Sequence, residues 1–172
     1  MEPIRPLILT LTLDETTQAF FDEQRQAYFP RERNYLGAHL TLFHHLPAVR
    51  EQALRGEMAR LCAEQAPLPL TVSGLMFLGG GVAYAVENDA LRALHQALQV
   101  RWSMDLTPQD QRALRPHITV QNKVPALTAR ALYQQLAADF TPFAATGSGL
   151  ALWAYCNGPW EPVDAWTFQG SV

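Results

Sequence analysis

A four-residue pattern occurs twice in the chain, and it constrains the fold more than any other feature. Residues 39–42 read His-Leu-Thr-Leu, and residues 117–120 read His-Ile-Thr-Val. Side chains on a β-strand alternate between its two faces, so each histidine points the same way as the threonine two positions later. The aliphatic residues point the opposite way, into a core. Each copy therefore predicts a strand that presents one imidazole and one hydroxyl on the same face.

The rest of the chain alternates between strand and helix signals. Alternating or continuous apolar runs predict strands, and apolar residues at helical spacing predict helices. The expected strands are residues 6–13, 38–43, 68–78, 82–86, 117–124, 143–155 and 163–169. The expected helices are residues 17–29, which Asp14 caps, residues 49–65, a third helix that Asp89 caps, and residues 128–140. The three glycines at 79–81 are interpreted as a turn between two paired strands. This order of elements is typical of an α+β protein.

The element order contains one unit twice: a helix, a His-x-Thr strand, a helix and a hairpin. Outside the motif the two halves show no convincing identity, so the repeat is one of architecture. Pseudo-symmetric halves that pack face to face would bring both motif strands into one cleft, despite their distance in the sequence. We therefore expect residues 1–172 to form a single bilobal domain, with one motif strand from each lobe.

Composition limits the classes of partner. The chain is 48% hydrophobic and 17% charged, which is typical of a folded protein. Its net charge is −3 and its pI about 5.9, whereas proteins that coat nucleic acid usually carry a basic face. The cysteines, Cys62 and Cys156, lack metal-ligand spacing and are expected to be reduced thiols. The apolar run at residues 6–13 is too short for a membrane span. We expect a cytoplasmic monomer that does not bind a membrane.

Two imidazoles and two hydroxyls in one cleft suit phosphodiester chemistry without a metal or other cofactor. An imidazole with an ordinary pKa near 6.5 acts as base or acid at neutral pH. One histidine can deprotonate an attacking hydroxyl or water while the other protonates the departing oxygen. Threonine hydroxyls can donate hydrogen bonds to the non-bridging phosphate oxygens. The sequence does not say which histidine takes which role.

These residues also carry a resemblance. The two motifs, with Arg115-Pro116 ahead of the second, resemble the 2H phosphoesterase superfamily, and within it the 2′-5′ RNA ligase-like or RNA 2′,3′-cyclic phosphodiesterase group. The resemblance implies a bilobal, pseudo-symmetric α+β fold with two antiparallel sheets flanking a central cleft and helices on the outside. It implies that His39 and His117 are the acid–base pair and that Thr41 and Thr119 bind phosphate.

The chain departs from the family pattern in two places. Many ligase-like members have a basic residue five positions after the second motif histidine; here that position is Asn122, and the base is Lys123. Many also have a short tyrosine-containing pattern near the C-terminus, where this chain has residues 153–160 with Trp153 and Trp160. The substrate therefore stays open among RNA cyclic phosphates, 2′-5′ oligonucleotides and ADP-ribose cyclic phosphate.

Further residues are candidates for substrate binding at the cleft. Arg115 and Lys123 are candidate phosphate contacts, and Tyr35 lies in an arginine-containing loop that either stacks a base or is a solvated surface. Phe43 shares the His39 face if strand alternation continues past Thr41, and would form an aromatic wall. His44 and His45 follow the first motif; we interpret them as a strand end rather than a metal site.

Two functions follow as hypotheses. The first is a metal-independent phosphodiesterase that acts on a 2′,3′-cyclic phosphate or a 2′-5′ phosphodiester, at an RNA terminus or on a small nucleotide. The direction of the reaction in the cell, hydrolysis or ligation, stays open. The alternative is a non-catalytic RNA-end or nucleotide-binding module. Two intact histidine motifs favour the enzyme, because binding alone needs no pair of titrating bases.

Overall fold

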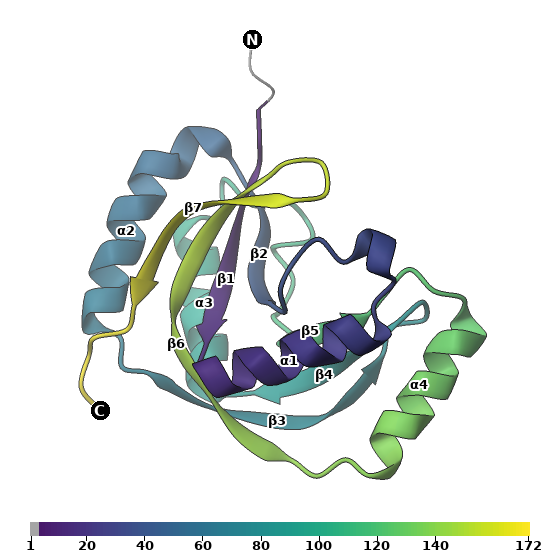
Figure 1. Cartoon of the computed structure of the whole chain (residues 1–172). Coiled ribbons are helices and arrows are strands. Elements are labelled where there is room, and N and C mark those ends of the chain that lie inside the picture. The colour runs from purple at the N-terminus through teal and green to yellow at the C-terminus, as the bar shows by residue number, and fades with distance from the viewer. Residues whose placement is uncertain (1–3) are drawn as a thin grey trace.

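The strands form one antiparallel sheet in a computed structural model that describes residues 4–172 (Figure 1). The strands are β1 (Leu7–Leu13), β2 (Leu40–Leu46), β3 (Leu68–Phe77), β4 (Val82–Glu87), β5 (His117–Gln121), β6 (Phe143–Tyr155) and β7 (Trp160–Thr167). The helices are α1 (Glu15–Tyr28), α2 (Glu51–Glu64), α3 (Asp89–Arg101) and α4 (Ala126–Ala138), with 3-10 turns at Arg31–Arg33 and Ala48–Arg50. The α+β class predicted from the sequence is confirmed.

The two motif strands occupy the two ends of this sheet. The strand order is β2-β1-β6-β3-β4-β5, and β7 pairs with β6 beside that path. Although β2 and β5 stand at opposite ends of the order, they contact each other. The sheet therefore curls until its ends meet, as Figure 1 shows for the strands around the centre of the molecule. This curvature brings the two motifs together.

β6 joins the two halves into one sheet. Its residue Gly147 pairs with Leu13 of β1 and with Leu68 of β3, so these strands flank β6 on opposite edges. Beyond Gly147, β6 pairs with β1 and β7; before it, β6 pairs with β3. The family resemblance implied two separate sheets. The structure instead has one continuous sheet, because a single long strand runs through both halves.

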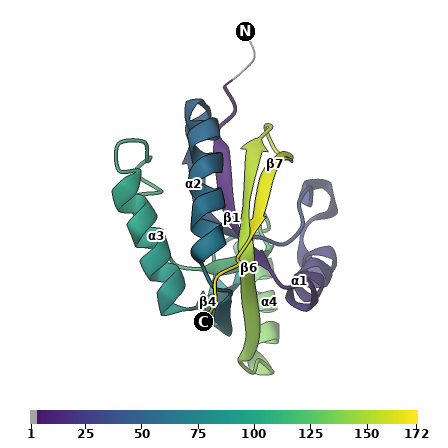
Figure 2. The ribbon, with the colours of Figure 1, turned by 90° about the vertical axis from the view of Figure 1, so that its left-hand side faces the viewer.

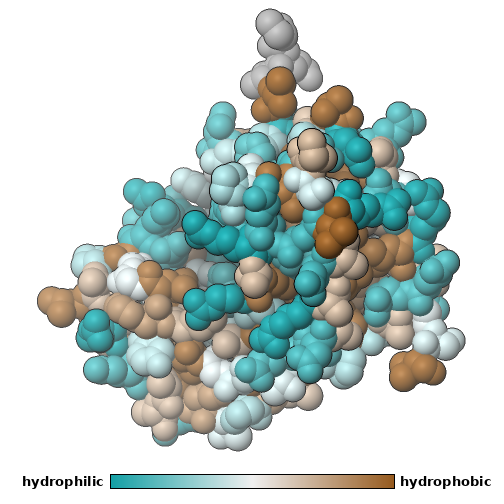
Figure 3. Space-filling view, turned by 180° about the vertical axis from the view of Figure 1, so that it is seen from behind, coloured by the Kyte–Doolittle hydropathy of each residue, from teal (hydrophilic) through white to brown (hydrophobic). Residues whose placement is uncertain are grey.

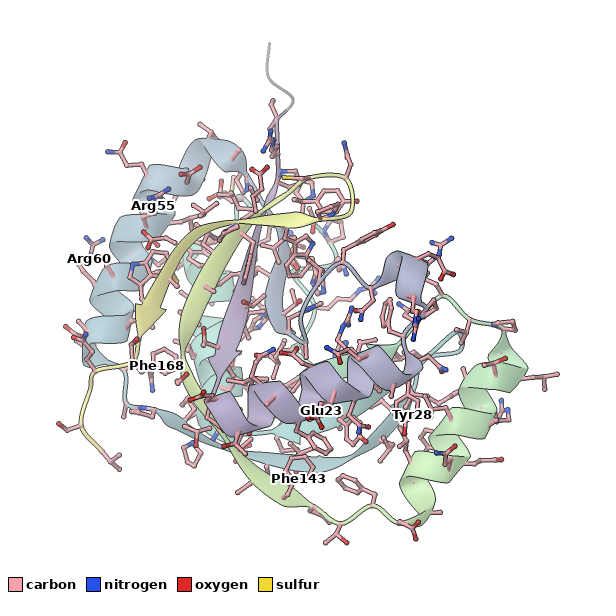
Figure 4. All side chains as sticks on the ribbon, viewed as in Figure 1. Glu23, Tyr28, Arg55, Arg60, Phe143 and Phe168 are labelled. Atoms are coloured by element: carbon pink, nitrogen blue, oxygen red, sulfur yellow. The ribbon has the colours of Figure 1, made fainter. Side chains whose placement is uncertain are left out.

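Helices cover the sheet from both sides. Figure 2 shows α2 and α3 on one side of β1, β6 and β7, and α1 and α4 on the other. α2 packs on β6 and β7, α4 on β3 and β4, and α1 on β5. Phe143 lies beneath α1 (Figure 4), with its ring centroid 5.4 Å from that of Phe20. On the face seen in Figure 3, hydrophilic and hydrophobic residues are interspersed. Within residues 4–172, no helix is both long and apolar enough to cross a membrane.

Local sequence signals account for most element boundaries. The Asp14 side chain accepts a hydrogen bond of 2.9 Å from the backbone N–H of Thr17, so it caps α1 as predicted. The predicted cap of α3 was wrong by one residue, because Asn88 accepts from the backbone N–H of Leu91, 2.7 Å away. β5 ends at Gln121, earlier than expected, because the chain turns at Lys123, whose φ is 62°.

Candidate active site

Both motif histidines make the same local hydrogen bond. Nδ1 of His39 lies 2.9 Å from the carbonyl oxygen of Gly37, and Nδ1 of His117 lies 2.7 Å from that of Arg115. A carbonyl oxygen only accepts, so the Nδ1 atom of each ring carries the proton and donates it. Nε2 of each ring is thereby left to exchange a proton with a bound molecule. The two histidines of the repeat therefore have the same tautomer.

The motif strands have the alternation that the sequence predicts. Ile118 and Val120 are fully buried, whereas His117 and Thr119 between them are half-buried. In the first motif, Leu40 and Leu42 are buried while Thr41 is half-buried. Thr41 pairs with Thr10 of β1, and Thr119 pairs with Ala83 of β4. Each strand therefore keeps its aliphatic side chains in the core and leaves its polar side chains accessible.

The charge state of His39 is set by burial and by neighbouring cations. The pKa of its imidazole falls from 6.5 to about 4. Burial of the ring is the largest cause, and the hydrogen bond to the carbonyl of Gly37 opposes it. The positive charges of Arg25 and His117 lower the pKa as well, so both lie within electrostatic reach of His39. At neutral pH, His39 is therefore uncharged, with a lone pair on Nε2.

Arg25 is a buried cation that the sequence analysis did not single out. Its side chain is 4% exposed, and its Nη1 donates a hydrogen bond of 3.0 Å to the carbonyl oxygen of Thr119. Nε donates to Oδ1 of Asn34 at 3.1 Å, and the guanidinium lies 4.1 Å from the centre of the Phe29 ring. Burial lowers the pKa of Arg25 to about 10, so it stays charged at neutral pH. It fixes the second motif strand to α1 and supplies positive charge beside His39.

The spacing of residues in α1 contains a signal that Arg25 is buried. Thr17, Phe21 and Arg25 are the buried residues of α1 and follow one another at intervals of four. An interval of four places residues on one helix face. An arginine in line with a core phenylalanine is therefore expected to point inward, where a charged side chain needs hydrogen-bond acceptors.

An aromatic cavity of about 290 Å³ opens beside His39. Tyr35, Trp153 and Trp160 contribute its aromatic walls, and Gln18 and Thr10 lie among its polar lining residues. The ring centroids of Trp160 and His39 are 4.6 Å apart, and those of Trp160 and Trp153 are 6.1 Å apart. Tyr35 therefore reaches the cavity. The two tryptophans of residues 153–160 lie there as well.

The prediction that Phe43 lines the cleft is wrong. The pairing of β1 with β2 shifts between Thr10–Thr41 and Leu9–Phe43, which marks a β-bulge. The bulge reverses the alternation, so Phe43 turns toward the core face of Leu9 and is 0% exposed. Its ring stacks on His95, with centroids 4.5 Å apart. No local pattern in the sequence marked this bulge.

Arg115 and Lys123 lie at opposite ends of the second motif strand. Arg115 is exposed just ahead of β5, and its carbonyl oxygen orients His117. Lys123 is exposed in the turn beyond the other end of β5, away from His117. Neither lines the aromatic cavity.

A larger cavity, of about 790 Å³, lies near Arg5 and contains none of the motif residues. Among residues 4–172, no cluster of three or more His, Cys, Asp or Glu side chains is arranged to hold a metal ion.

Comparisons with known proteins agree with this arrangement. A family model described as the 2′-5′ RNA ligase superfamily matches residues 13–159. Among solved structures, the chain is similar to TT0787 of Thermus thermophilus, with 17% identity, a TM-score of 0.68, and coverage of 97% of this chain and 100% of that one. It is also similar to Escherichia coli LigT complexed with 3′-AMP, with 19% identity, a TM-score of 0.63, and coverage of 96% and 99%. At these identities the similarity is one of fold. No curated protein matches the chain.

Proposed function

Since the chain belongs to the 2′-5′ RNA ligase superfamily, within the 2H phosphoesterases, we propose that it is a metal-independent phosphodiesterase with a paired-histidine mechanism. Family and fold indicate a phosphoesterase-type enzyme. The proposed substrate carries a 2′,3′-cyclic phosphate or a 2′-5′ phosphodiester, in RNA or in a nucleotide. The observation that carries the proposal is the matched pair of histidines, each held through Nδ1 by the carbonyl oxygen two residues earlier.

The lowered pKa of His39 supports the following proposal for the proton transfers. His39 is uncharged at neutral pH, so its Nε2 takes the proton of the attacking water. The water oxygen forms a bond to phosphorus while the bond to one ribose oxygen breaks. His117 is proposed to act as the acid, with its Nε2 giving a proton to that departing oxygen. In the direction of ligation the same two atoms act with exchanged roles.

Thr41 and Thr119 are proposed to bind the phosphate. Their hydroxyls lie on β2 and β5, two residues after the histidines, and both side chains are partly accessible. Hydroxyl donors stabilise the non-bridging oxygens, where charge increases in the transition state. Arg25 adds a fixed positive charge next to the second strand, and the exposed Arg115 is proposed to contact a neighbouring phosphate of an RNA chain.

The aromatic cavity is the proposed site for the base of the nucleotide. Tyr35, Trp153 and Trp160 offer ring faces for stacking next to His39. Base–aromatic stacking contributes about 1–3 kcal/mol per base and tolerates different bases. Structures of Escherichia coli LigT are described as complexes with 3′-AMP, NADP+ and ATP. These ligands of a similar fold support a nucleotide as the substrate of this chain.

The test is hydrolysis of a short RNA that ends in a 2′,3′-cyclic phosphate, in the presence of EDTA. Wild type is expected to turn over with a bell-shaped dependence on pH, and His39→Gln and His117→Gln each to lower kcat by about 10²- to 10⁴-fold. His45→Gln is the matched control, because its exposed ring lies outside the aromatic cavity. A requirement for added divalent metal would contradict the proposal. RNA binding by a wild type without turnover, on this or any cyclic or 2′-linked nucleotide, would instead indicate a binding module.

A further inference from the structure

Side chains form hydrogen bonds with the backbone of β2 along its outer edge, where an inner strand would pair with a neighbouring strand. β2 is the last strand of the sheet on its side, so within the described residues, 4–172, its second edge has no ladder partner. The carbonyl oxygen of Leu42 on this edge lies 2.9 Å from Nε2 of His95 in α3. The backbone N–H groups of His44 and His45 both donate to the carboxylate of Asp110, at 2.9 Å each. α3 and the loop after it thus hold the first motif strand.

Asp110 is the central residue of this contact. Its side chain is 1% exposed, and Oδ1 lies 3.2 Å from Nδ1 of His44 as well as accepting the backbone bond. Burial by itself would raise the pKa of the Asp110 carboxyl, but the hydrogen bonds from His44 and His45 hold the pKa below its ordinary value. A buried carboxylate whose two oxygens accept four hydrogen-bond contacts has one well-defined position.

The loop that carries Asp110 leads directly to the second motif. Nε2 of Gln99, in α3, donates to the carbonyl oxygen of Asp110 at 2.9 Å and to that of Arg112 at 2.7 Å, which fixes the loop to the helix. The loop continues to Arg115, whose carbonyl oxygen orients His117. Asp110 therefore joins the strand after His39 to the segment before His117.

The distance between His39 and His117 depends on contacts such as those that Asp110 makes. β2 and β5 contact each other, but they are not hydrogen-bonded neighbours in the sheet. Among residues 4–172 no backbone ladder sets the distance between the two motifs, so this distance depends on contacts outside the sheet, one of which runs through α3 and its loop. We propose that Asp110 is a positioning residue, which holds β2 and the approach to β5 so that His39 and His117 act on one phosphate. This inference rests on the proposed paired-histidine function.

The first test is Asp110→Asn on the cyclic phosphate substrate. The substitution replaces one acceptor oxygen by an NH₂ group that faces backbone N–H donors, so the bulge of β2 loses part of its support. We expect kcat to fall by about tenfold to hundredfold with KM changed less than about threefold, as displacement of catalytic groups predicts. Asp105→Asn is the control, since Asp105 lies in the same loop and its carboxylate forms an ion pair with Arg50, at 3.6 Å, rather than with β2. An unchanged kcat, or a change in KM alone, would overturn the inference.

A second measurement does not need turnover. His117→Gln is expected to raise the titration midpoint of His39, followed by NMR, because the two rings influence each other. In the Asp110→Asn background the same substitution should change the His39 midpoint less, because the rings are no longer held together. An equal change in both backgrounds overturns the inference, even if the proposed substrate is wrong.

If Asp110→Asn does not fold, the variant Gln99→Met tests the inference instead. This variant releases the loop from α3 and leaves Asp110 itself intact. Its kcat is expected to fall by about threefold to tenfold with KM retained, and the His39 midpoint is expected to become less sensitive to His117→Gln. Wild-type behaviour of Gln99→Met in both measurements would overturn the inference.

Discussion

Replacing Arg25 by methionine tests how a buried charge supports the second motif strand. The guanidinium donates at 3.0 Å to the carbonyl oxygen of Thr119 and at 3.1 Å to Asn34. Each hydrogen bond to a charged group contributes about 1.5–3 kcal/mol, and an acceptor left buried without a donor costs about 1–3 kcal/mol. Methionine is cheaper to bury than a guanidinium, which offsets part of this loss. We expect the free energy of unfolding to fall by about 2–4 kcal/mol, measured by urea denaturation.

The same substitution has a predicted effect on catalysis. The positive charge of Arg25 is one of the causes that lower the pKa of His39. Its removal should raise that pKa, while burial, the largest cause, still holds it below 6.5. Since His39 must be uncharged to act as the base, the acidic limb of the profile of kcat/KM against pH should move to higher pH. The profile is measured on the cyclic phosphate substrate in EDTA.

Arg60→Met is the control for Arg25→Met. Arg60 points outward from α2 (Figure 4), and it is exposed, so it should tolerate the change with less than about 0.5 kcal/mol lost. Equal stability of Arg25→Met and Arg60→Met would refute the supporting role of the Arg25 charge. An acidic limb that stayed in place or moved to lower pH would refute the effect of that charge on His39.

Three further outcomes are expected. The imidazole of His39 binds a proton near pH 6.5 in the unfolded chain and near pH 4 in the folded protein, so the free energy of unfolding falls as pH drops from 6.5 to 4. The whole shift corresponds to about 3 kcal/mol, and partial exposure of the ring reduces its effect to about 1–2 kcal/mol. His39→Gln, measured by urea denaturation, should therefore lose about 1–2 kcal/mol less stability than wild type over this pH range. Trp160→Ala should raise KM about tenfold while Trp160→Phe keeps most affinity, whereas an unchanged KM would argue against base stacking. Gly81→Ala would place a Cβ atom 1.9 Å from the backbone oxygen of Gln121 and should cost about 3 kcal/mol, whereas Gly74→Ala has open space; equal melting temperatures would contradict this close approach.

The motif strands and the element order could be predicted because their signals are local. Alternation over four residues was enough to bury Ile118 and Val120 while leaving His117 and Thr119 accessible. Asp14 caps α1 through a contact three residues away, which the sequence also indicates. Signals of this kind involve neighbours along the chain, so they survive in a single sequence.

The rest of the candidate site depends on contacts between distant segments. Phe43 does not line the cleft, because a bulge in the pairing of β2 with β1 interrupts the alternation of side chains. Asp110 reaches His44 from a loop that the sequence marks only as polar. Trp160 carries no signal that separates a cavity wall from core packing; its position beside His39 follows from how β7 pairs with β6. Such placements need the folded chain.

The most direct test of the paired-histidine account compares single and double variants. kcat on an RNA ending in 2′,3′-cyclic phosphate, in EDTA, would be measured for His39→Gln, His117→Gln and the double variant. If both rings act in one transition state, the losses are strongly non-additive, and the double variant is about as slow as the slower single variant. Losses that multiply in the double variant would show two independent contributions and contradict the account.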